Sequence, residues 1–115
     1  VSIISCPIVR EQDGLAMSSR NRLLSPEQRR AAPRIFASLA ELKKKSFEKE
    51  VSAMETFFKK KISQQKELKV EYFSVASPSD LIPVTMLEEG VSYRIFVSVF
   101  AGKTRLIDTV ELGRI

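Results

Sequence analysis

Histidine and tryptophan are absent from this chain, cysteine occurs once, and no apolar run is long. Without histidine there is no imidazole base, no histidine metal ligand and no Ser-His or Cys-His pair. The lone Cys6 cannot form an internal disulfide, which favours a reducing compartment, and we interpret it as a small core residue. The apolar start, residues 1–9, is too short to span a bilayer and lacks a basic leader. We therefore expect a cytoplasmic protein with no membrane partner.

What is present indicates one small globular domain. The 115 residues suffice for one domain at most, and 43% apolar with 29% charged residues is ordinary for a globular protein. The chain opens at Val1 directly in strand-like sequence, so we expect it to be a piece of something larger. The net charge of +5 suggests a nucleic-acid partner, although a solvated basic surface or a neutralising neighbour domain would explain it equally.

The first half of the chain predicts helices after a short strand. Residues 1–6 are β-rich and end at Pro7. Ser25, Pro26 and Gln28 then combine a cap, a proline at the first helical position and a capping box. Pro33 predicts a kink, or a short helix followed by a second one. A further amphipathic helix is predicted from a cap at Ser46. Its apolar stripe comprises Phe47, Val51, Met54, Phe58 and Ile62.

From residue 68 the apolar period changes to two, which predicts strands. Residues 69–76 form one strand, with Val70 and Tyr72 expected on the same face. Residues 92–100 and 103–112 form a hairpin, for which we predict a type I turn at Ala101-Gly102 with a glycine bulge. The order of elements predicts an α+β fold, a small three-stranded antiparallel sheet packed against two or three helices.

The side chains best suited to binding a ligand cluster between residues 7 and 25. Ser18, Ser19 and Arg20 stand side by side, after a turn at Asp13-Gly14. Hydroxyls can donate to phosphate oxygens, and arginine offers a fixed fork of donors with a permanent charge. These residue types indicate an anion-binding or nucleotide-binding loop, but they also occur in ordinary loops.

The wider pattern resembles the pantothenate synthetase (pantoate–β-alanine ligase) family. The resemblance is carried by CPIVRE at residues 6–11, DGLAMSSRN at 13–21 and GKTRLID at 102–108. It covers nearly the whole chain and implies the C-terminal domain of such an enzyme. The family uses ATP and Mg²⁺ to form pantoyl adenylate from pantoate, and β-alanine then displaces AMP to give pantothenate. The resemblance also implies that a Rossmann-like N-terminal domain, absent here, holds both acid and amine.

Carried over to this sequence, the family pattern assigns the ATP-binding residues. Ser18, Ser19 and Arg20 would bind the phosphates as a KMSKS-like loop, while Val9 and Met17 would line the adenine end through backbone groups. The resemblance makes Arg20 the expected catalytic residue, since a fixed cation stabilises the departing pyrophosphate. No residue is expected to ligate a metal, and Mg²⁺ would be held with the nucleotide. The chain alone would be an inactive lid, and its partners would be ATP and the missing domain of a homodimeric enzyme.

Two other interpretations stay open. One is a basic nucleic-acid-binding module that uses two lysine triplets, residues 43–45 and 59–61, together with the hairpin. The other is a stand-alone interaction domain with no ligand. For the lysine triplets, charge at helix C-termini is the alternative explanation.

Overall fold

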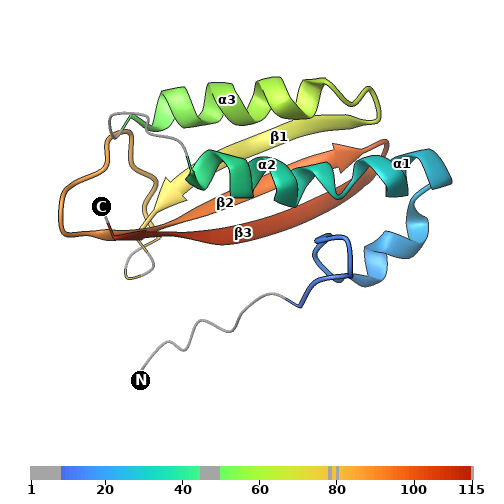
Figure 1. Cartoon of the computed structure of the whole chain (residues 1–115), viewed down its shortest axis with the longest axis horizontal. Helices are drawn as coiled ribbons and strands as arrows, with labels where there is room; N and C mark the ends of the chain where they lie inside the picture. Colours follow the sequence, from blue (N-terminus) through green and yellow to red (C-terminus); the bar gives the residue numbers. More distant parts are fainter. Residues whose placement is uncertain (1–8, 45–49, 78, 80, 115) are drawn as a thin grey trace.

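The computed structural model describes residues 9–44, 50–77, 79 and 81–114. Within these ranges the chain forms one short 3₁₀ helix, three α-helices and a three-stranded antiparallel sheet (Figure 1). The elements are η1 (Ser19–Leu23), α1 (Pro26–Ala31), α2 (Arg34–Lys43), α3 (Val51–Ser63), β1 (Leu68–Ala76), β2 (Ser92–Ala101) and β3 (Thr104–Arg114). The predicted α+β fold is confirmed. The strand predicted over residues 1–6, with Cys6, lies outside the described residues.

Helix α1 begins at the predicted capping box. The Ser25 hydroxyl accepts from the Gln28 N–H at 3.2 Å, and the Gln28 side chain accepts from the Ser25 N–H at 2.9 Å. The helix lasts six residues, and α2 starts directly after Pro33. The prediction of a short helix followed by a second one is therefore confirmed, since proline lacks the N–H that would continue the ladder.

Helix α3 begins later than the sequence predicted. Glu50 is extended, with φ −95° and ψ 115°, and forms an antiparallel bridge with Met86. The Val51 N–H donates to the Thr85 carbonyl at 3.1 Å, so the segment between β1 and β2 satisfies the first backbone donor of the helix. A continuous helix from Ser46 is therefore wrong at its start, and Ser46 itself lies outside the described residues.

The sheet has the order β1-β2-β3, with α2 and α3 on one face (Figure 1). A β-bulge at Glu71 corrects the predicted facing of β1. Val70 pairs with Val99 and Tyr72 with Ser98, so Glu71 is an extra residue that shifts the alternation. Val70 packs against the core, whereas Tyr72 is 43% exposed. Placing Val70 and Tyr72 on one face was therefore wrong.

The turn of the β2–β3 hairpin lies one residue later than predicted. Ala101 pairs with Thr104, which leaves Gly102-Lys103 as the loop. Gly102 has φ +62° and Lys103 does not have a positive φ, the pattern of a type II′ turn. The predicted type I turn at Ala101-Gly102 is wrong, because Ala101 is a buried strand residue. A Cβ on Gly102 would lie 2.5 Å from the Gln28 side chain, so the turn packs against the start of α1.

The core lies between the sheet and α2 with α3. It includes Ile35, Leu39, Leu42, Met54, Phe58, Ile62, Val75, Ile95, Val97 and Val99. The longest described helix, α3, has 13 residues, and none of the described helices is both long and apolar enough to cross a bilayer.

Candidate functional site

A small hairpin, residues 9–17, leads into the candidate site. Arg10 and Ala16 form an antiparallel bridge, and the Met17 N–H donates to the Val9 carbonyl at 2.8 Å. At its tip Gly14 has φ +96°, a conformation that favours glycine. We call this segment the 9–17 hairpin. It ends directly before Ser18, so its position sets where residues 18–20 lie.

Two ion pairs tie the 9–17 hairpin to the rest of the fold. The Arg10 guanidinium donates to both Asp108 carboxylate oxygens at 2.8 and 2.9 Å, on β3. Asp13 accepts from Arg29 on α1 at 2.7 and 3.3 Å, and this hydrogen bond lowers the pKa of Asp13 below its ordinary value. In the first pair Asp108 is buried and Arg10 half-buried, whereas the second pair is exposed to solvent. Loss of Arg10 would leave the buried Asp108 carboxylate without its partner charge.

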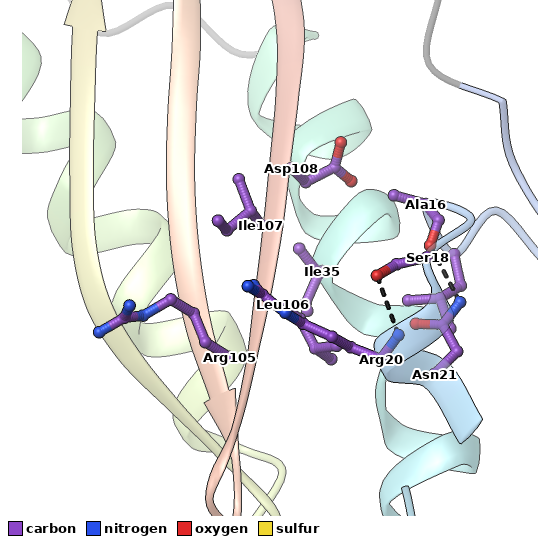
Figure 2. A pocket seen from close by; sticks show the side chains of 10 residues that line it. Ala16, Ser18, Arg20, Asn21, Ile35, Arg105, Leu106, Ile107 and Asp108 are labelled. Carbon is purple, nitrogen blue, oxygen red and sulfur yellow. Dashed lines mark hydrogen bonds between the residues drawn. The ribbon is translucent and has the colours of Figure 1, made fainter. Parts of the chain in front are cut away.

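Residues 18–20 follow as the start of η1. The Ser18 hydroxyl caps this helix by accepting from the Arg20 N–H at 3.1 Å (Figure 2). The hydroxyl hydrogen of Ser18 thus remains available to an outside acceptor. Ser19 and Arg20 are exposed. The Asn21 side chain donates to the Ala16 carbonyl at 3.1 Å, while its buried Oδ1 has no partner among the described residues.

Two hollows meet at Ser18 and Asn21. A cavity of about 190 Å³ lies between η1 and β3, with Arg20 and Leu106 in its wall (Figure 2). A more open hollow of about 690 Å³ is lined by Met17 and Ser19, among others. The structure therefore brings four of the five predicted ATP-binding residues to adjoining hollows. Val9 lines neither and is 66% exposed.

Of the backbone groups predicted to line the adenine end, the Met17 N–H already has a partner within the chain. Because the Met17 N–H already donates to the Val9 carbonyl, a ligand could not take that N–H without opening the 9–17 hairpin. The side chain of Met17 is 53% exposed. The described residues contain no group of three or more His, Cys, Asp or Glu that could hold a metal. Magnesium bound with the nucleotide stays a prediction.

Arg20 differs from Arg10, Arg29 and Arg105 around the site, whereas Arg22, which lines the more open hollow, likewise makes no ion pair in the described part of the chain. Arg10 and Arg29 are paired with carboxylates, as is Arg105 with Glu71 at 2.7 Å. Figure 2 shows the Arg105 side chain pointing across the sheet, away from Arg20. In the described part of the chain Arg20 makes no ion pair, and its side chain extends from η1 toward β3 (Figure 2). It is a permanent cation available to an anionic ligand.

Sequence reasoning missed the pair of Arg10 and Asp108. The available signal was Asp108 itself, which interrupts the apolar alternation of β3 and therefore needs a partner if buried. Its side chain is 4% exposed. Arg10 is 98 residues away in sequence, and no local pattern connects the two.

Two lysines of the second triplet, residues 59–61, are paired with carboxylates. Lys59 pairs with Glu55 at 2.7 Å and Lys61 with Glu41 at 3.3 Å. These contacts neutralise part of the second triplet, so nothing in the described residues favours the nucleic-acid interpretation.

Comparisons with known proteins agree with the resemblance. The family model for pantoate-beta-alanine ligase matches residues 1–111. A pantothenate synthetase from Pseudothermotoga lettingae is 41% identical over all of this chain and 41% of its own length. One from Clostridium botulinum is 39% identical over 94% of this chain and 38% of its own length. The chain thus spans about two fifths of these relatives.

Solved structures similar to this chain are also pantothenate synthetases. A pantothenate synthetase from Thermus thermophilus is 31% identical, with a TM-score of 0.78 over 94% of this chain and 39% of that one. The Francisella tularensis pantoate-beta-alanine ligase, complexed with beta-gamma ATP and beta-alanine, is 25% identical with a TM-score of 0.61 over 93% of this chain and 32% of that one. Because the family model covers nearly the whole sequence, this chain belongs to the pantoate-beta-alanine ligase family.

Proposed function

We propose that this chain is the C-terminal lid domain of an ATP-dependent ligase that condenses pantoate with β-alanine. The pantoate carboxylate attacks the α-phosphorus of ATP, which releases pyrophosphate and leaves pantoyl adenylate. The β-alanine amine then attacks the acyl carbon, and AMP leaves as pantothenate forms. The lid contributes residues 18–20 as a KMSKS-like phosphate loop. A Rossmann-like N-terminal domain holds the acid and the amine, so the chain alone is inactive.

The observation that carries this proposal is Arg20, which makes no ion pair with any described residue and lies beside the Ser18 hydroxyl, in a chain of this family. The Ser18 oxygen already accepts from the Arg20 N–H, which leaves its hydrogen to donate to a phosphate oxygen. Arg20 can add charge as pyrophosphate departs, and a lid that brings this charge only on closure favours the transition state over the ground state. The related Francisella enzyme was crystallised as a complex with beta-gamma ATP, which supports ATP as the ligand. Mg²⁺ would arrive with the nucleotide, and the compartment we propose is the cytoplasm.

The test is Arg20→Ala in the full-length ligase that carries this chain. We expect pyrophosphate release to fall by about 100- to 1,000-fold, the usual cost of one stabilising group at a developing anion. Arg20→Lys, which keeps the charge but loses the fork, should retain part of the rate.

Arg30→Ala is the matched control. Arg30 is exposed on α1, with only a 3.9 Å contact to Glu27, and does not line either hollow. It should leave the rate unchanged. Full turnover by Arg20→Ala, or an equal loss in both variants, would refute the role of Arg20.

A further inference from the structure

We propose that Arg10 and Asp108 are positioning residues that hold the Ser-Ser-Arg segment, residues 18–20, in its working place. This inference rests on the proposed function for its catalytic part. The two residues lie on the 9–17 hairpin and on β3, and the two terminal nitrogens of Arg10, Nη1 and Nη2, donate to the two carboxylate oxygens of Asp108. Such a fork fixes direction as well as distance, because two parallel hydrogen bonds resist rotation.

Arg10 is held on several sides at once. One of its nitrogens also donates to the Gly14 carbonyl at 3.1 Å, across the 9–17 hairpin. The guanidinium lies 3.9 Å from the centre of the Phe36 ring, on α2. One arginine thus joins the hairpin tip, a helix and an edge strand. A cation that is both stacked and ion-paired is held more rigidly than an exposed arginine.

Asp108 is held just as firmly. Its side chain is 4% exposed, and its Oδ1 also accepts from the Thr109 N–H at 2.7 Å. Asp108 lines the same 190 Å³ cavity as Ser18 and Arg20, so β3 forms one wall and the segment of residues 18–20 the other. The pair of Arg10 and Asp108 sets the separation of these walls, together with the packing of η1 on β3.

The experiment compares Asp108→Asn with Glu71→Gln. Both remove the charge of a carboxylate on the sheet that binds an arginine, but Glu71 pairs with Arg105 on β3 and contacts no residue of the 9–17 hairpin. In the 115-residue chain, amide hydrogen exchange is measured at Glu11 and Met17, whose N–H groups close the hairpin. Exchange at the Val84 amide, which donates a hydrogen bond to the Val75 carbonyl of β1, serves as the reference for the far end of the sheet.

We expect Asp108→Asn to speed exchange at the two hairpin amides by about tenfold or more, with Val84 little changed, as in local opening. Glu71→Gln should leave the hairpin amides as they are. Uniformly faster exchange would mean general destabilisation and would overturn the proposal, as would an unchanged hairpin. Arg10→Lys, which keeps the charge without the fork, gives a second route should Asp108→Asn fold poorly, and its effect should lie between wild type and Asp108→Asn.

In the full-length ligase, a displaced segment should lower kcat for pyrophosphate release more than it raises the KM for ATP, because the contacts strengthen in the transition state. Glu71→Gln should change neither. A hairpin loosened without loss of kcat would refute the positioning role in catalysis. The exchange result is independent of ATP, so it stands even if Arg20→Ala proves fully active and the proposed function fails.

Discussion

Replacing Gly14 by alanine should destabilise the fold through two separable costs at the tip of the 9–17 hairpin. Gly14 has φ +96°, a region that costs an L-residue roughly 1–2 kcal/mol. A Cβ at this position would also lie 2.8 Å from Cδ2 of Phe36, closer than real Cβ contacts. Overpacking of this kind costs about 1–3 kcal/mol when a ring must shift. The smaller entropy of the unfolded alanine chain returns about 0.4–1 kcal/mol.

The sum predicts a loss of about 1–4.5 kcal/mol in the free energy of unfolding for Gly14→Ala. Gly90→Ala separates the two costs, because Gly90 has φ +81° but a Cβ there would meet nothing within 4 Å. It should lose only about 0–1.5 kcal/mol, the backbone cost less the entropy gain. The difference between the two variants measures the contact with Phe36.

Urea unfolding of the 115-residue chain, followed by far-ultraviolet circular dichroism, measures both variants. Phe36→Leu and the double variant Gly14→Ala/Phe36→Leu complete a double-mutant cycle. Leucine removes the ring edge, so we expect a coupling energy of about 1–2 kcal/mol that favours the double variant. Equal losses at Gly14 and Gly90, with no coupling to Phe36, would refute the reasoning.

Three further predictions concern stability. The hydrogen bond from Arg29 lowers the pKa of Asp13, so their pair adds stability above the ordinary carboxyl value of 3.8 and loses it as pH falls through the folded value. In Asp13→Asn, Tm should therefore fall less steeply with decreasing pH in this range than in the wild type. Added salt should reduce the Tm difference between the two proteins, because the pair is exposed. Ser25→Ala removes one half of the capping box with Gln28 and should cost about 1 kcal/mol in urea unfolding. Phe58→Ala empties a fully buried core position and should cost about 3–5 kcal/mol by the same measurement.

Sequence reasoning succeeded where the determinants are local. The capping box of Ser25 and Gln28 and the break at Pro33 depend on neighbours within one turn, and both are found as predicted. The alternation of β2 also held, since its inward residues are buried against α2 and α3. Each of these signals is fixed by backbone chemistry or by a repeat within a single element.

It failed where two distant segments meet. Glu50 carries no strand signal, and it is extended because Met86 lies beside it. The bulge at Glu71 depends on its neighbours across the sheet, where the carboxylate accepts from the buried Ser98 hydroxyl at 2.7 Å and from Arg105. A period-two pattern cannot register one extra residue, so Tyr72 was placed on the wrong face.

The candidate site depends both on local sequence signals and on contacts between distant segments. Residue types alone marked residues 18–20, but they could not say which arginine near the site is free to meet a ligand. Arg10 and Arg20 are ten positions apart and equally charged in sequence. Only the fold separates them, since Asp108 is brought to Arg10 from 98 residues away and no carboxylate of the described chain is brought to Arg20. The paired arginine suits a structural role because its charge is already satisfied, and the unpaired one suits a phosphate.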